Sequence, residues 1–272
     1  YEIHWRDWSS DVCSSDLGGR GIPLADPRVL LADADAEDVP AEEKARRERA
    51  REGGSGIVSY CVDGAGNRVT FTINGQLFLT DLTAGATRAI TIEEDELKPV
   101  LNPRISPDGR HIMYTTGTYL VDVDLADVSD TTDAGEDAGD AVSIVASVPQ
   151  DDADDVADTQ DGTQDDAQSD AAESQAGEWK IGLAEFAAGE EMDRYDGFWW
   201  GPDSRHIIFE MFNAAPEPMW YISDPANPQT PASGRRYARA LTSNADVRLT
   251  LAELAYDGHD EYAGLGIQQI SW

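Results

Sequence analysis

The sequence predicts an all-β fold, a partial β-propeller with one helix near the N-terminus. Three observations predict it. Short runs of β-branched and aromatic residues alternate with turn-forming pairs, a Pro-Asp-Gly/Ser turn recurs along the chain, and the spacing of these turns is that of propeller blades.

The β-strand pattern begins after position 56. The three runs richest in β-branched and aromatic residues are Ile57–Tyr60, Val69–Ile73 and Gln76–Leu82. Asp-Gly, Gly-Asn and Asn-Gly pairs separate them, and such pairs are typical of tight turns between antiparallel strands. We therefore expect short hairpins in this part of the chain.

The recurring unit is an apolar residue, a Pro-Asp-Gly/Ser turn, a basic residue and an apolar strand. Ile105–Tyr114 reads ISPDGRHIMY, Trp200–Phe209 reads WGPDSRHIIF, and a related turn followed by VTF lies within Tyr60–Phe71. Pro suits the second position of such a turn. The first two turns are about 44 residues apart, and the second and third are near 45 apart once an acidic segment is discounted. The pattern predicts about three blades.

The acidic segment accounts for much of the formal net charge of -33 on 272 residues. Nineteen of the 53 acidic residues lie between Asp122 and Glu178, a stretch without Lys or Arg. We expect residues 126–177 to be a disordered insertion in a blade loop, because they hold too little apolar surface to offset the entropy of ordering. Only Val142–Val148 is apolar enough to form a strand.

Composition also excludes several classes of function. The negative charge argues against nucleic-acid binding, and no apolar run approaches the roughly 20 residues of a membrane span. The acidic segment has no D-x-D-x-D-G calcium loop, so we expect no metal and no cofactor. Two cysteines imply no disulfide framework, and no signal peptide is visible, which favours the cytoplasm.

The N-terminal part divides into two segments. Residues 1–17 show no periodicity and resemble translated sequencing-adapter read-through; we expect an artefact, with a natural disordered tail as the alternative. Residues 18–56 contain a predicted Arg-rich helix, Ala41–Arg51, with its acids first and its bases last, as the helix dipole favours. Residues 57–272 make up the partial propeller.

Three stretches resemble the N-terminal domain of the dipeptidyl peptidase IV family, especially its cytosolic members. They are EEKARRERAREGGSGIVSY (Glu42–Tyr60), EEMDRYDGFWWGPDS (Glu190–Ser204) and RYARALTSNADVRLTLAEL (Arg236–Leu254). The resemblance implies an eight-bladed propeller joined to a C-terminal α/β-hydrolase domain with a Ser-Asp-His triad.

The hydrolase domain is absent from this sequence, so we expect no catalytic residue in it. No G-x-S-x-G elbow is present, and none of the four histidines is a plausible triad member. His111 and His206 stand at equivalent positions after two of the repeated turns, which indicates a structural role.

The resemblance implies that Glu190 and Glu191 bind the α-ammonium group of a peptide substrate. Neighbouring residues of a regular helix point about 100° apart, so we expect an irregular turn, permitted by Gly189, to bring the carboxylates together. The alternative is a solvated pair on a helix face.

The resemblance also implies that an arginine of the helix contacts the substrate backbone, and Arg47, Arg49 and Arg51 all fit. The alternative is a salt-bridged surface helix with i,i+4 pairs such as Glu43–Arg47. We expect Trp199 and Trp200 to belong to a blade core.

Two functions remain open on the sequence alone. The first is the substrate-recognition part of a serine-type dipeptidyl aminopeptidase, which removes N-terminal dipeptides in proteolysis. Its partners would be peptides with a free N-terminus, the hydrolase domain and, in the full-length protein, a second copy in a homodimer. The alternative is a non-enzymatic propeller that serves as a protein-binding scaffold.

Overall fold

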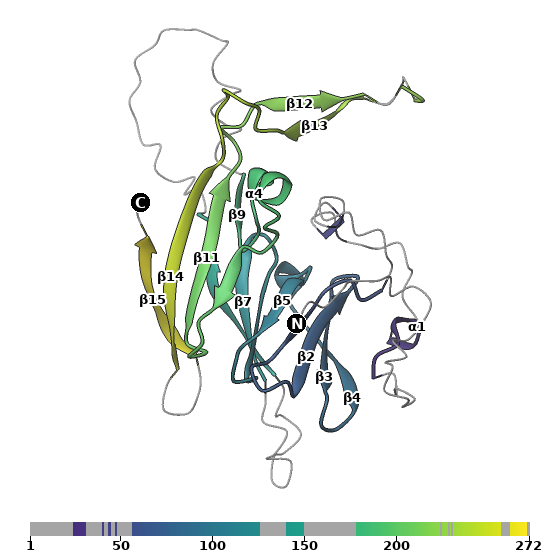
Figure 1. Ribbon diagram of the computed structural model, residues 1–272, viewed down its shortest axis with the longest axis vertical. Helices are drawn as coiled ribbons and strands as arrows, with labels where there is room; N and C mark the ends of the chain where they lie inside the picture. The colour runs from purple at the N-terminus through teal and green to yellow at the C-terminus, as the bar shows by residue number, and fades with distance from the viewer. Residues whose placement is uncertain are drawn as a thin grey trace. The chain divides into compact units, whose positions relative to one another are not determined.

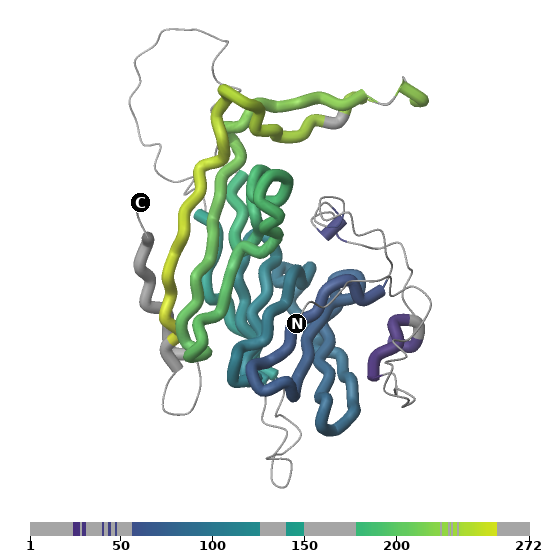
Figure 2. The backbone as a smooth tube through the Cα atoms, viewed as in Figure 1, coloured from purple at the N-terminus to yellow at the C-terminus, as the bar shows by residue number. Residues whose placement is uncertain are grey.

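The computed structural model describes residues 24–30, 40, 43–44, 47, 56–125, 140–149, 178–223, 225–227, 229, 231–256 and 262–270 (Figure 1). These residues form an all-β structure, a partial propeller of antiparallel sheets (Figure 2). The predicted artefact at 1–17 lies outside the described residues, as does most of the predicted helix at 41–51. None of the described helices has the length and apolar composition that crossing a bilayer requires.

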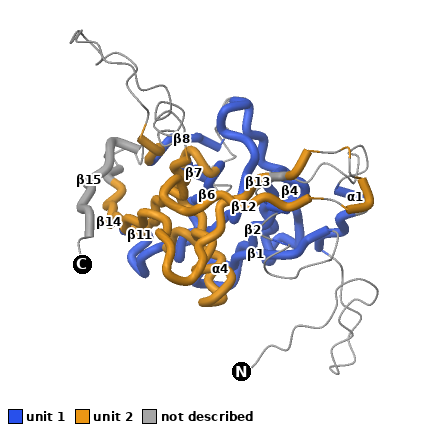
Figure 3. Tube along the Cα trace, turned by 90° about the horizontal axis from the view of Figure 1, so that it is seen from above, with its two compact units in different colours: residues 1–116, 120–145, 200–206 blue, residues 117–119, 146–199, 207–272 orange. Residues whose placement is uncertain are grey.

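The chain divides into two compact units, shown in different colours in Figure 3. Unit 1 comprises residues 1–116, 120–145 and 200–206, and unit 2 comprises residues 117–119, 146–199 and 207–272.

The first sheet lies in unit 1, after a short helix, α1 (Pro27–Leu30). It is an antiparallel meander of β1 (Tyr60–Val62), β2 (Arg68–Ile73), β3 (Gln76–Asp81) and β4 (Ala86–Ile90). The hairpins were predicted, although the first strand begins at Tyr60 and not at Ile57.

The turn between β2 and β3 shows why this sequence folds into a hairpin. Ile73 pairs with Gln76, which leaves a two-residue loop of Asn74 and Gly75. Both loop residues have positive φ, 51° and 77°, as a twisted hairpin turn requires and as Asn-Gly readily supplies. On the buried face of the sheet, the rings of Phe71 and Phe78 stack 5.5 Å apart.

The second sheet follows a 3-10 helix, η1 (Asp95–Leu97). Its strand order is β5 (Leu101–Ile105), β6 (His111–Thr115), β7 (Tyr119–Asp124) and β8 (Ala141–Ser147). Every residue of β6 is buried, as expected for a central strand with both faces covered. Strand β8 is the one predicted from the apolar run Val142–Val148. The expectation of disorder throughout 126–177 is therefore wrong for residues 140–149.

The third sheet belongs mainly to unit 2. Its strand order is β10 (Phe198–Trp200), β11 (His206–Asn213), β14 (Asp246–Tyr256) and β15 (Tyr262–Ile270), and β9 (Trp179–Ile181) also pairs with β11. A separate hairpin joins β12 (Met219–Ile222) to β13 (Ser233–Arg236), and a short helix, α4 (Phe186–Glu191), precedes β10. The three larger sheets correspond to the three blades that the repeated turns predicted.

The second and third repeated turns have the same hydrogen bonds. Ser106 N–H donates to His111 O at 2.8 Å, and Gly201 N–H donates to His206 O at 2.6 Å. Gly109 and Ser204 occupy the same position of the turn, with φ of 77° and 59°. The repeat recognised in the sequence is thus a repeat of local structure.

Within unit 1, hydrogen bonds join neighbouring turns to one another. Gly64 N–H donates to Pro107 O at 2.9 Å, and Asp108 N–H donates to Ser204 Oγ at 2.9 Å. Gly64 is required at its position, because an added Cβ would lie 2.7 Å from Pro107 O.

His111 is buried at the start of β6, and its Nδ1 lies 3.1 Å from Asp122 Oδ2 on β7. Burial lowers the pKa of His111, but the hydrogen bond and charge of Asp122 outweigh burial, with help from Asp124 and Asp108, and the pKa is raised. His206 likewise pairs with Asp203 at the third turn. His111 is buried, whereas the side chain of His206 is 43% exposed, so the two equivalent positions differ in burial.

The raised pKa of His111 predicts a pH-dependent contribution of Asp122 to stability. Because the folded-state pKa exceeds the unfolded one, this stabilisation is complete below about pH 6.5 and is lost as the pH rises through the folded-state pKa. Urea denaturation should give a larger loss of unfolding free energy for Asp122→Asn at about pH 5.5 than at about pH 9. If the loss of unfolding free energy caused by Asp122→Asn is constant or grows with pH, this role of Asp122 is contradicted.

Candidate functional site

Helix α4 begins at a side-chain cap. Glu185 precedes the helix, and its carboxylate accepts the N–H groups of Ala187 and Ala188, both at 2.6 Å. A carboxylate at this position satisfies backbone donors that a helix N-terminus otherwise leaves unpaired. Ala188 and Gly189 are buried, so the exposed carboxylates follow directly after a packed turn.

The helix ends two residues after Gly189. The N–H groups of Met192 and Arg194 both donate to Ala188 O, at 3.2 and 3.0 Å, and Asp193 has a positive φ of 50°. The expected irregular turn at Gly189 is wrong: the helix continues through Glu191, and the left-handed residue is Asp193. Glu190 and Glu191 are therefore the last two helical residues, exposed on a helix as the alternative describes, and their side chains leave the helix about 100° apart.

Both carboxylates are available to a ligand. Glu190 and Glu191 are exposed, and neither side chain forms a hydrogen bond or ion pair with another residue in the described ranges of the chain. They lie at the C-terminal end of a helix, where the backbone carbonyl groups carry partial negative charge. The site therefore concentrates negative charge and suits a cation that carries hydrogen-bond donors.

An ion pair joins the half-buried Arg194, just after this helix, to the buried Glu210. Arg194 Nη2 lies 2.7 Å from Glu210 Oε2, and the side chain of Glu210 is only 2% exposed. Burial raises the pKa of Glu210, and the charge of Arg194 opposes part of that rise. Arg194 also donates to Asp196 O at 2.9 Å and lies over the ring of Trp199.

The close approach of two backbone segments fixes this region. An added Cβ at Gly197 would lie 2.3 Å from the backbone nitrogen of Leu183, closer than any Cβ can approach. Glu210 N–H donates to Gly197 O at 2.7 Å. Gly197 thus allows the segment that leads into β10 and the segment that leads to α4 to pack together.

Both tryptophans of the motif were expected to belong to a blade core, and Trp199 does not. The indole Nε1 of Trp200 donates to Arg104 O at 2.9 Å, and its ring lies 6.4 Å from that of His111. Trp199 is 37% exposed and is in contact with Arg194, so it is not a core residue.

The predicted arginines are only partly described. Arg47 has helical conformation and forms an ion pair with Glu43 at 2.7 Å, the i,i+4 pair named as the alternative. Both side chains are largely buried, at 11% and 9% exposure, which differs from a surface pair. Arg49 and Arg51 lie outside the described residues. A contact between one of these arginines and a substrate stays a prediction.

Sequence reasoning missed Glu185, Arg194 and Glu210. Glu210 did leave a signal, because it is the one acid in the apolar strand HIIFEMF. A charged residue in a buried strand calls for a charged partner. The identity of that partner could not be read from the sequence, because it depends on how α4 packs.

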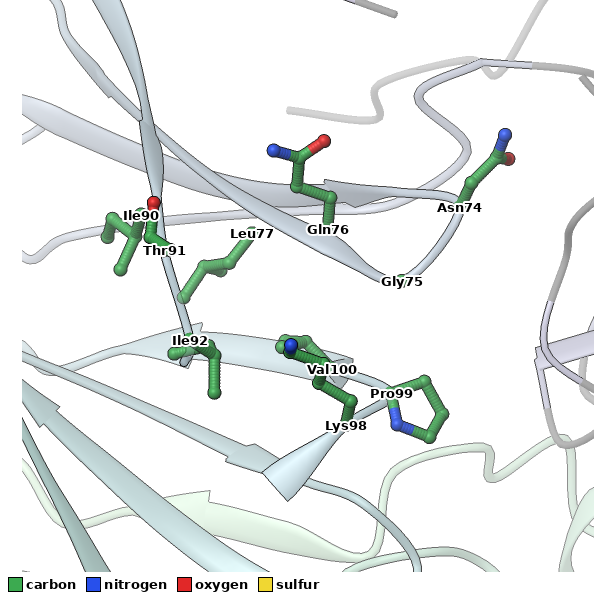
Figure 4. Close-up of a pocket in the computed structure, with 10 residues that line it drawn as sticks. All are labelled: Asn74, Gly75, Gln76, Leu77, Ile90, Thr91, Ile92, Lys98, Pro99 and Val100. Atoms are coloured by element: carbon green, nitrogen blue, oxygen red, sulfur yellow. The ribbon is translucent and has the colours of Figure 1, made fainter. Parts of the chain in front are cut away.

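Unit 1 contains a half-open cavity of about 520 Å³ (Figure 4). Its lining comes from the β2–β3 turn, from β3 and β4, and from residues 98–100, and it includes none of the predicted site residues. In the part of the chain that the structure describes, no group of three or more His, Cys, Asp or Glu side chains could hold a metal ion.

Residues 185–194 and Glu210 lie within a stretch that matches a family model. Residues 159–268 match the model of the family described as the dipeptidyl peptidase IV (DPP IV) N-terminal region. Among solved structures, the chain is similar to the crystal structure of Porphyromonas gingivalis dipeptidyl peptidase 4, with 17% sequence identity and a TM-score of 0.49. That similarity covers 83% of this chain and 27% of the other, so this chain spans about a quarter of its length.

The close approach at Gly197 predicts a strongly destabilising substitution. Gly197→Ala should cost at least about 2 kcal/mol of unfolding free energy, because backbone atoms of Leu183 cannot move away from the new Cβ without disturbing α4. A suitable control is Gly66→Ala, where φ is 73° but no atom lies within 4 Å, with an expected cost of about 1 kcal/mol. Equal losses for the two variants in urea denaturation would contradict the packing described for Gly197.

Proposed function

We propose that this chain recognises substrate for a dipeptidyl aminopeptidase, with Glu190 and Glu191 binding the α-ammonium group of the peptide, because residues 159–268 match the model of the dipeptidyl peptidase IV N-terminal region. The observation that carries the proposal is the exposed carboxylate pair at the end of α4, which forms no bond with the described residues around it.

The chemistry of a peptide N-terminus matches this pair. An α-amino group has a pKa of about 7.7–8.0, so at neutral pH most molecules carry a positive charge and three N–H donors. Two carboxylates can accept two or more of these donors in charge-assisted hydrogen bonds, each roughly twice as strong as a neutral one. An acetylated N-terminus has lost both the charge and the donors, so the pair discriminates against it.

Holding the N-terminus also determines where a peptide is cut. A peptide anchored by its first nitrogen presents one particular bond to a nucleophile at a fixed distance, which for a dipeptidyl peptidase is the second bond. The contribution of this chain is thus positioning, which removes much of the entropy cost of bringing the reacting groups together. The nucleophile would come from a hydrolase domain, the main partner in this proposal.

Two further expectations belong to the same proposal. The full-length protein would form a homodimer, and it would act in the cytoplasm on peptides with free N-termini.

One observation favours the alternative, a protein-binding scaffold. The β12–β13 hairpin exposes four consecutive apolar or aromatic residues: Met219, Trp220, Tyr221 and Ile222. Exposed aromatic residues of this kind are common in protein interfaces. The gene beyond Trp272 distinguishes the two functions, because a G-x-S-x-G followed by Asp and His supports the peptidase, and further blades followed by a stop codon support the scaffold.

The proposal predicts selective loss of recognition when the pair is neutralised. In the protein expressed from its complete gene, Glu190→Gln and Glu191→Gln should each raise the KM for a free-amine Ala-Pro chromogenic substrate about 10- to 100-fold, the effect of losing a charged hydrogen bond. Cleavage of the N-acetylated substrate should stay equally poor. In the unaltered protein, KM should rise as the pH passes about 8 and the peptide amine loses its proton.

The chain offers a matched control, because Glu93 and Glu94 form a second exposed Glu-Glu pair, in unit 1. Glu93→Gln and Glu94→Gln should leave KM unchanged. The proposal fails if the Glu190 and Glu191 variants retain the KM and the amine preference of the unaltered protein.

A further inference from the structure

We propose that Glu210 is a positioning residue: its buried carboxylate holds both ends of the segment 185–194 and thereby directs Glu190 and Glu191 at the ligand. This inference rests on the proposed function, since it explains how the carboxylate pair is oriented.

The two oxygens of Glu210 bind the residues on either side of α4. Oε1 accepts the backbone N–H of Glu185 at 3.2 Å, and Oε2 lies 2.7 Å from Nη2 of Arg194. Glu185 is the N-cap of the helix, and Arg194 follows its C-terminal turn. One carboxylate therefore ties the beginning of the segment to its end.

Glu210 is itself rigidly held. It is in the middle of β11, where its N–H donates to Gly197 O at 2.7 Å and its carbonyl accepts Gly182 N–H at 2.9 Å. A carboxylate fixed on a buried strand can hold the residues bonded to it, here Glu185 and Arg194, in one position. Helix α4 needs this support, because an isolated six-residue helix is not stable in water.

Glu210 has a second effect, which is to occupy Arg194. If the helix continued past Glu191, Glu190 and Arg194 would be i,i+4 neighbours, the spacing at which Glu and Arg pair along a helix. The positive φ of Asp193 ends the helix, and the guanidinium of Arg194 turns to Glu210. The charge of Glu190 is thus left for the ligand.

The two effects predict different consequences for two variants. Glu210→Gln keeps an oxygen for the Glu185 N–H but releases Arg194, which can then compete with a peptide ammonium for Glu190. Glu210→Gln combined with Arg194→Met also loses the ion pair between residues 194 and 210, but it removes the competing cation. The double variant should therefore bind a free N-terminus better than Glu210→Gln and less well than the unaltered protein.

The experiment measures the affinity of the full chain for the tripeptide Ala-Pro-Ala and for its N-acetyl form by calorimetry. We expect Glu210→Gln to reduce the preference for the free amine about tenfold, a change of about 1.4 kcal/mol, and the double variant to recover part of that loss. Hydrogen exchange should become faster in residues 186–194 and stay unchanged in β14. Asp140→Asn, which breaks the Arg88–Asp140 ion pair in unit 1, is the control and should change neither readout.

The outcomes separate this inference from the proposed function. If Glu190→Gln and Glu191→Gln lose the amine preference while Glu210→Gln and the double variant keep it, the positioning role is wrong and the proposed function stands. If the unaltered chain has no amine preference, or the Glu190 and Glu191 variants keep it, both are wrong. If Glu210→Gln fails to fold, the double variant decides the question, because it buries no unpaired charge. The inference is overturned if the double variant keeps the full preference for the free-amine tripeptide over its N-acetyl form.

Discussion

The turn at residues 202–205 sets the register on which the candidate site depends. The carboxylate of Asp203 accepts the N–H groups of Arg205 and His206, and these bonds hold the pKa of Asp203 below its ordinary value. With Ser204 in the left-handed conformation, β10 turns directly into β11. That register brings Glu210 N–H to Gly197 O and turns the Glu210 side chain toward Glu185 and Arg194. A turn that recurs along the chain thus fixes the segment proposed to bind the ligand.

Electrostatics explains why the exposed pair is left open. Burial of Glu210 would be costly without a cation, and Arg194 meets that need and is thereby drawn away from Glu190. The result is an ion pair with a buried carboxylate, next in sequence to two exposed carboxylates at a helix C-terminus that have no cationic partner among the described residues. Like charges placed there oppose the helix dipole, a local cost that a bound ammonium group would offset.

The parts of the fold that follow from short-range rules were predictable. Asn74-Gly75 favours a hairpin wherever it stands, and the Pro-Asp-Gly/Ser turns carry their own hydrogen bonds, so the β2–β3 hairpin and the repeated blades follow from the sequence. Strand β8 was predicted because seven largely apolar residues interrupt an acidic stretch. The helical conformation of Glu190 and Glu191 and the contacts of Glu210 were not predicted, because both depend on tertiary packing of α4 against β11.

We propose that Glu190 and Glu191 receive a peptide N-terminus while Arg194 stays bound to Glu210. This proposal is tested most directly by a crystal structure of the protein, expressed from its complete gene, with a free-amine tripeptide bound. We expect the peptide nitrogen within about 3 Å of an oxygen of each carboxylate, and Arg194 still paired with Glu210. A peptide N-terminus bound elsewhere, or an Arg194 that pairs with Glu190 and leaves Glu210, would contradict the account.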